Sequence, residues 1–90
     1  MADQIEVTDE GESFVVTVGD GASRTRHAVR ASAVELQRLA PGVAPKRVIE
    51  AAFRFLLYRE AKESILARFG VGEISRYFPE FERTISEYLR

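Results

Sequence analysis

The chain has 90 residues, of which 46% are hydrophobic and 30% are charged, with no cysteine and a formal net charge of −1. This length fits a single domain, and the composition is that of a folded protein rather than a disordered one. The absence of cysteine excludes disulfides, thiolate nucleophiles and cysteine-based zinc sites.

The first third of the chain has the residue pattern of β-strands. Residues 14–18 are rich in valine, and Asp20-Gly21 follows them as a signal for a two-residue hairpin turn. This turn would pair Gly19 with Ala22. Because Ile5 and Val7 alternate in the same way, the pattern predicts a three-stranded antiparallel meander.

The predicted hairpin has two chemically different faces. A register shifted by one residue would place arginines among the valines, where desolvation opposes them. We therefore expect the apolar face to meet the helices and the arginines to face water. The apolar face consists of Phe14, Val16, Val18, Thr25, His27 and Val29, and the other face consists of Ser13, Val15, Thr17, Arg24, Arg26, Ala28 and Arg30.

The remaining two-thirds has the pattern of helices. Ser32 and Glu35 form a capping box, and the short helix that they open is expected to end before Pro41-Gly42. Pro45 suits the first position of the next helix. This helix is apolar on most sides, which predicts that it is central and buried. Its charged residues share one stripe: Lys46, Arg47, Glu50 and Arg54.

Two possibilities stay open beyond that helix. The charged residues 59–63 indicate that it either bends or breaks there. Residues 65–69 are expected to add an apolar helical edge that Gly70 ends. Gly72 would begin a short helix and Pro79 the last one. The prediction is one α+β domain over residues 1–90, with a three-stranded antiparallel meander (1–31) packed against three to four helices (32–90).

The charge is unevenly distributed along the chain. Residues 1–20 contain six acidic residues and no base, whereas residues 21–47 contain six basic residues and one acid, a net of +5. The middle third is therefore a candidate anion-binding or nucleic-acid-binding stretch, unless the acidic first strand neutralises it in the fold. The candidate contacts are Arg24, Arg26, Arg30, Lys46 and Arg47.

The sequence does not build a recognisable active site. His27 is the only histidine, and its place on the apolar strand face favours a structural role over catalysis. No spacing of histidines or acids matches a metal site. The serines lie in no nucleophile turn, and the pairs Glu60/Glu63 and Glu80/Glu82 are typical of a solvated helical surface. We expect no catalytic residue, no cofactor and no metal.

Residues 24–60 resemble a ribbon-helix-helix unit, because a basic strand leads to a capped short helix, a loop and a second helix that begins Pro45-Lys46-Arg47. In that family, strands from two chains pair and lie in the DNA major groove. The resemblance implies that Arg24, Arg26 and Arg30 face bases and that Lys46 and Arg47 contact a phosphate. The chain departs from the family pattern in lacking a serine or threonine at the start of the second helix.

The C-terminal half resembles a family of short uncharacterised bacterial proteins. The resemblance is carried by Phe55-Leu56-Leu57, Lys62-Glu63-Ser64-Ile65-Leu66 and Arg76-Tyr77-Phe78-Pro79-Glu80-Phe81-Glu82. The family would have proline at the helix break, whereas this chain has Ala61, which favours a continuous helix through Lys62. The resemblance implies a compact folded unit and assigns no functional residue.

The aromatic residues of the tail are candidates for the core or for a protein contact. Five aromatics after the central helix exceed what a core of this size would cover, so some would be exposed. We therefore expect a non-enzymatic binding or interaction module that self-associates as a homodimer or binds another protein, the alternative being a dimeric DNA-binding protein. With no membrane span and no apparent signal sequence, a cytoplasmic location is expected. The candidate protein contacts are Tyr77, Phe78, Phe81 and Tyr88.

Overall fold

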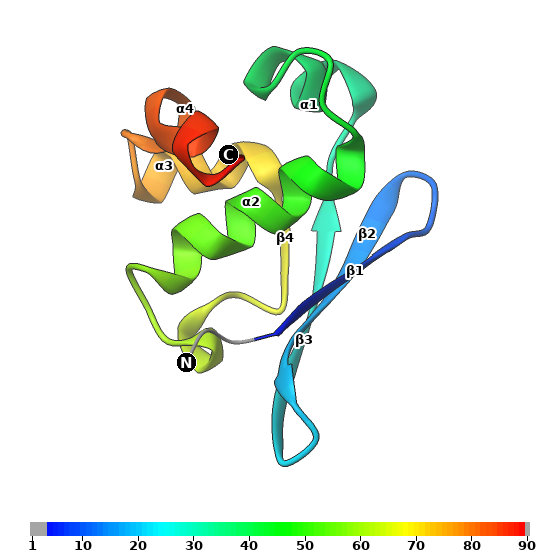
Figure 1. Cartoon of the computed structure of the whole chain (residues 1–90), viewed down its shortest axis with the longest axis vertical. Helices are drawn as coiled ribbons and strands as arrows, with labels where there is room; N and C mark the ends of the chain where they lie inside the picture. Colours follow the sequence, from blue (N-terminus) through cyan, green and yellow to red (C-terminus); the bar gives the residue numbers. More distant parts are fainter. Residues whose placement is uncertain (1–3, 90) are drawn as a thin grey trace.

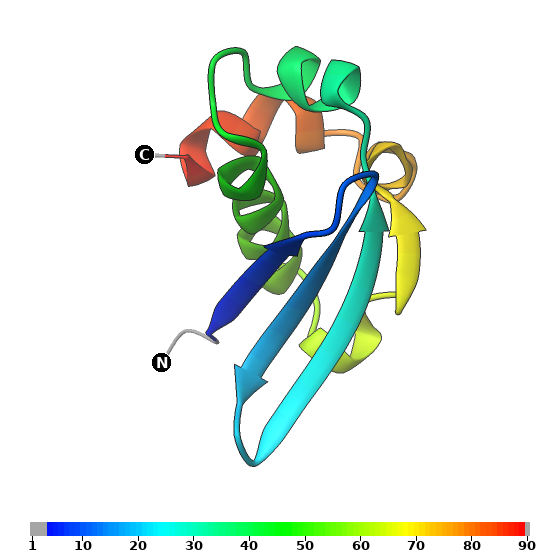
Figure 2. The ribbon, with the colours of Figure 1, turned by 90° about the vertical axis from the view of Figure 1, so that its right-hand side faces the viewer.

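A mixed four-stranded sheet carries its helices on one face. The structure is a computed structural model and describes residues 4–89. The sheet has the order β1-β2-β3-β4, in which the first three strands are antiparallel and β4 runs parallel to β3. Figure 2 looks onto the face of the sheet that the helices leave uncovered. The strands are β1 (Ile5–Asp9), β2 (Ser13–Asp20), β3 (Ser23–Arg30) and β4 (Arg68–Gly70).

The helical part consists of one long helix and several short pieces (Figure 1). The α+β class and the antiparallel meander are confirmed. The prediction did not contain β4, which makes the sheet mixed. The helices are α1 (Ala33–Leu39), α2 (Pro45–Leu57), α3 (Ile74–Tyr77) and α4 (Phe81–Thr84), with 3-10 turns η1 (Lys62–Ser64), η2 (Val71–Glu73) and η3 (Ile85–Tyr88).

The hairpin turn lies one residue later than predicted. Asp20 pairs with Ser23, so Gly21 and Ala22 form the turn, and every cross-strand pair is shifted by two residues from the predicted register. Gly19 has a φ of 109°, which lets the strand continue to Asp20, whose carboxylate accepts a hydrogen bond from the amide of Ala22 at 3.3 Å. Because side chains alternate with a period of two, this shift leaves the predicted faces unchanged.

The helix starts follow the sequence signals. Ser32 caps α1 with both halves of the capping box: its hydroxyl accepts from the amide of Glu35 at 3.1 Å, and its own amide donates to the Glu35 carboxylate at 3.0 Å. Pro45 is the first residue of α2, as predicted. This helix lies between the sheet and the C-terminal segment, contacting β1 on one side and η3 on the other. It is the central helix that its narrow polar stripe predicts.

The chain leaves the helical conformation after Leu57, so the expected continuous helix through Lys62 is wrong. Ala61 is extended, with φ −68° and ψ 154°. The guanidinium of Arg59 folds back over the Phe55 ring, 3.7 Å from its centroid, and donates to the Phe55 carbonyl oxygen at 3.2 Å. The expected helical edge at residues 65–69 is also wrong, because this segment is extended and leads into β4.

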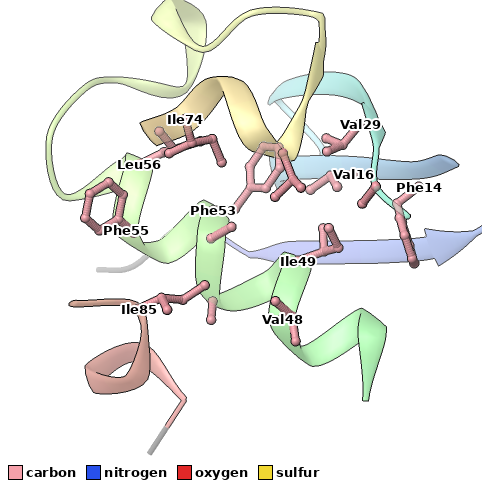
Figure 3. Close-up of a cluster of buried hydrophobic side chains, with 14 of the residues drawn as sticks. Phe14, Val16, Val29, Val48, Ile49, Phe53, Phe55, Leu56, Ile74 and Ile85 are labelled. Atoms are coloured by element: carbon pink, nitrogen blue, oxygen red, sulfur yellow. The ribbon is translucent and has the colours of Figure 1, made fainter. Parts of the chain in front are cut away.

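The core lies between the inner face of the sheet, α2 and the C-terminal helices (Figure 3). Phe53 packs toward the sheet, with its ring 5.3 Å from that of His27 and 6.0 Å from that of Phe69. Phe55 packs toward the C-terminal helices, with its ring 5.0 Å from that of Phe81. The two aromatic residues of α2 therefore connect the sheet on one side with the C-terminal helices on the other.

Candidate binding surfaces

His27 is part of the core rather than of a site. It is 2% exposed, as expected from the predicted inward face. Its Nδ1 lies 2.8 Å from the carbonyl oxygen of Leu66, and its Nε2 lies 2.9 Å from the hydroxyl of Thr25. A carbonyl oxygen can only accept, so Nδ1 carries a proton and donates it to Leu66. Both nitrogens are thus engaged within the chain.

Three of the five candidate anion contacts lie together on the uncovered face of the sheet. Arg24, Arg26 and Arg30 are exposed there, and the parallel pairing of β4 adds Arg68 beside Ala28. We call these four residues the arginine face. Sequence reasoning missed Arg68, because the three residues of β4 are too few to show an alternating pattern.

Only one residue of the arginine face is paired within the described chain. Arg30 donates to the carboxylate of Glu73 at 3.2 Å. Among residues 4–89, no carboxylate forms an ion pair with Arg24, Arg26 or Arg68. The acidic first strand therefore does not neutralise these three arginines through direct ion pairs.

The remaining two candidate anion contacts lie on the other side of the sheet. Lys46 and Arg47 are exposed at the start of α2, which covers the inner face. Arg47 donates to the carbonyl oxygen of Leu89 at 2.7 Å. The five candidate residues therefore do not form one continuous basic surface. Both edges of β3 are also occupied, one by β2 and the other, along residues 28–30, by β4. Pairing of β3 with the same strand of a second chain, as the ribbon-helix-helix resemblance implies, would have to displace β4.

The aromatic residues of the tail divide between core and surface. Phe81 is fully buried, so its prediction as a protein contact is wrong. Phe78 and Tyr88 are half-buried, and each ring stands edge-on to Phe55 at 5.8 Å. Tyr77 is 67% exposed. Of the four candidates, only Tyr77 is a largely free surface residue.

An apolar groove opens between the segment before β4, the end of α2 and α3. Its volume is about 370 Å³, within the range of roughly 300–1,000 Å³ typical of ligand-binding clefts. The exposed side chains Leu66 and Tyr77 border it, and the half-buried Phe78 lines it. Its floor consists of the buried side chains of Leu56, Ile65, Phe69 and Ile74. The sequence did not predict this groove, because it depends on the extended segment that was expected to be helical.

Two carboxylates stand at the groove. Glu73 is engaged, since its carboxylate accepts from Arg30 and, at 2.8 Å, from the amide of Gly70. Glu60 is half-buried and forms no ion pair or side-chain hydrogen bond with the residues described. The groove therefore combines an apolar floor with one carboxylate that is free to meet a cation.

Arg59 holds the end of α2 against the C-terminal helices. Its guanidinium donates to the carboxylate of Glu80 at 3.2 Å and to the hydroxyl of Tyr88 at 3.4 Å. The hydrogen bond to Tyr88, more than the ion pair with Glu80, raises the pKa of Arg59 above its ordinary value. A backbone hydrogen bond at Glu80 and the contact with Arg59 lower the pKa of the Glu80 carboxyl.

Comparison with known proteins assigns the chain to no family and no function. No family model, no curated protein and no solved structure matches this chain. Within the described residues, no helix has the length and apolarity needed to cross a membrane, and no group of three or more histidine or acidic residues could hold a metal ion. The function must therefore be inferred from the two surfaces themselves.

Proposed function

We propose that the chain is a non-enzymatic protein-interaction module that binds an amphipathic segment of another protein in its apolar groove. One or more apolar side chains of the partner insert between Leu66 and Tyr77. A lysine or arginine beside the apolar anchor meets the carboxylate of Glu60. The groove residues do no covalent chemistry in this function, and they act through shape and charge.

The observation that carries the proposal is the concentration of exposed apolar side chains at the groove. Four large hydrophobic residues are exposed among residues 4–89, and two of them, Leu66 and Tyr77, border this one depression. Exposed apolar surface gathered in one place is typical of contact sites, whereas single exposed residues are ordinary.

The construction of the groove supports binding rather than filling by the chain itself. Its floor is the outer layer of the hydrophobic core, so its shape is held by packing that exists without a partner. A preformed floor lowers the ordering cost of association. A tyrosine at the rim offers a large apolar surface together with a hydroxyl, the combination enriched at protein interfaces.

The charge of the groove defines the class of partner. An acidic segment would place like charges beside Glu60 and Glu73, which disfavours it. A segment with a basic residue next to its apolar anchor would instead pair with Glu60. DNA binding in the manner of the ribbon-helix-helix family stays an untested prediction. It is less favoured because its five basic residues lie on opposite sides of the sheet.

Selection from a randomised short-peptide library displayed on phage would test this function. We expect enriched peptides to combine apolar residues with lysine or arginine. Their affinity for Leu66→Asp should fall about tenfold or more, as is usual when a central apolar contact is lost. Val34→Asp is the matched control, because Val34 is 78% exposed on α1, away from the groove, and its substitution should leave binding unchanged.

A second pair of variants tests whether the carboxylate of Glu60 contributes to peptide binding. Glu60→Gln should weaken the basic peptides, whereas Glu63→Gln should not, because Glu63 is exposed but does not line the groove. Enrichment of acidic peptides, or equal binding to the wild type and to Leu66→Asp, would contradict the proposed function. Circular dichroism of each variant would confirm that the fold is retained.

A further inference from the structure

We infer that the uncovered face of the sheet docks a second copy of this chain, face to face, about a two-fold axis that runs along the strands. This surface lies on the opposite side of the sheet from α2 and shares no residue with the lining of the groove. The inference therefore stands independently of the proposed function.

The first observation is the layout of charge across this face. On β3 and β4 it carries the arginine face, three of whose members have no ion pair among the described residues. On β1, Glu6 points outward, because the flanking Ile5 and Val7 pack against the core. Glu10 and Glu12 are exposed at the turn that follows β1. The face is thus acidic along one side and basic along the other.

The second observation is the register that aligns these charges. Glu6 pairs with Thr17, which pairs with Arg26, so the three residues form one row across the sheet. At the other end of the strands, Ser13 pairs with Arg30 close to the acidic turn. The Glu6 row therefore carries an acid at the β1 side and an arginine at the β3 side.

These rows select one arrangement of two copies. A two-fold axis along the strands, passing between β2 and β3, places the β1 side of each copy over the β3–β4 side of the other. Glu6 of each copy then meets the region of Arg26 and Arg68 of the other, twice by symmetry. An axis across the strands would place acids over acids and is disfavoured.

The middle of the face permits close approach. Between the two charged sides lie small or medium, uncharged side chains: Ser13, Val15, Thr17 and Ala28, all partly covered already. No helix stands in front of β2 and β3 on this side of the sheet (Figure 2). Two such faces can pack as layers with their strands nearly aligned, the usual geometry of stacked sheets.

The size of the face predicts a weak, salt-sensitive dimer. Four strands about 4.8 Å apart, with about six residues on average at roughly 3.3 Å per residue, give a flat area on the order of 400 Å². This is about half of the ~800 Å² per partner of a standard interface. Charge therefore carries much of the affinity, and added salt should weaken the dimer.

Analytical ultracentrifugation at low salt, over a range of protein concentrations, tests the inference by charge exchange. The wild type should dimerise. Glu6→Arg alone and Arg26→Glu/Arg68→Glu alone should each raise the dissociation constant at least about tenfold, because like charges then face each other. An equimolar mixture of the two variants should form a heterodimer, since both symmetry-related contacts become attractive again. A merely structural effect of the substitutions could not give this rescue.

Arg38→Glu/Arg76→Glu is the matched control, because it changes the net charge equally at exposed positions off this face and should dimerise like the wild type. A wild type that stays monomeric at every concentration would overturn the inference. So would a dimer that survives Arg26→Glu/Arg68→Glu, or a mixture that fails to associate. A monomer that binds a single-stranded oligonucleotide through the same arginines would identify nucleic acid as the occupant and would also overturn it.

Discussion

Nδ1 of His27 lies 2.8 Å from the backbone carbonyl oxygen of Leu66. This hydrogen bond joins β3 to the extended segment that precedes β4. The imidazole also packs against Phe53 of α2, so a single side chain connects the sheet, the central helix and that segment. The side chain of Leu66 points into solvent at the rim of the groove, and His27 holds its backbone in place.

Replacement of His27 by alanine should therefore destabilise the fold. The substitution leaves the Leu66 carbonyl without its partner and opens a cavity beside Phe53, for an expected loss of about 2–3 kcal/mol in the free energy of unfolding. Urea denaturation measures the change. Arg26→Ala, on the exposed face of the same strand, should change stability by less than about 0.5 kcal/mol. Equal stability of the two variants would show that the hydrogen bonds of His27 are not structural.

The two glycines of the hairpin should respond differently to alanine. Gly19 has a positive φ, and a Cβ there would collide with the backbone of Ser23, so Gly19→Ala should cost about 1–3 kcal/mol. Gly21 has open space around it and no positive φ. Gly21→Ala should be neutral or stabilise by up to about 1 kcal/mol, because the unfolded chain loses freedom. Thermal unfolding of the pair compares them directly, and the reverse order would contradict the observed turn.

Arg59 should matter more to stability than the neighbouring arginine of α2. Arg59→Met removes the contact with the Phe55 ring, the hydrogen bond to the Phe55 carbonyl and the ion pair with Glu80, for an expected loss of about 1–2 kcal/mol. Arg54 forms only an exposed pair with Glu50 four residues earlier, so Arg54→Met should cost about 0.3–0.5 kcal/mol. Chemical denaturation of both variants tests this ranking. Similar losses would mean that the Arg59 contacts add nothing to an ordinary surface pair.

The lowered pKa of Glu80 predicts part of the response to acid. A carboxyl whose pKa is lower in the folded than in the unfolded state contributes stability above its unfolded pKa and loses it as the pH falls through its folded pKa. The wild type should therefore exceed Glu80→Gln in stability at neutral pH, and the difference should vanish in strong acid. Unfolding measured at a series of pH values, with Glu87→Gln as control, tests this. A difference that grows on acidification would contradict the sign.

Where the local pattern was strong, the sequence predicted the structure well. The valines of one strand and the arginines of the other showed which face of the hairpin is buried, even though the turn was misplaced. A shift of two residues preserves the face of every side chain. The capping box at Ser32 and Pro45 at the start of α2 marked both helix starts, since each acts through contacts within one turn.

Where long-range contacts decide the structure, the sequence was insufficient. Just after the break at Leu57, Arg59 contacts Glu80, which is 21 residues away in the chain. The extended path of residues 65–69 depends on β3, where the amide of Ala28 donates a hydrogen bond to the carbonyl oxygen of Ala67. An apolar run in this segment is equally compatible with a helix. Because the groove and Arg68 both result from that path, neither could be found before the structure.

Amide chemical-shift mapping of the ¹⁵N-labelled chain with a selected basic, apolar peptide tests the protein-interaction function most directly. The largest shifts should fall on the backbone of residues 64–69 and 74–78, and the outward positions of β2 and β3 should stay unchanged. Shifts confined to the sheet face, with the amides around Leu66 unmoved, would contradict the assignment of the groove as the binding surface.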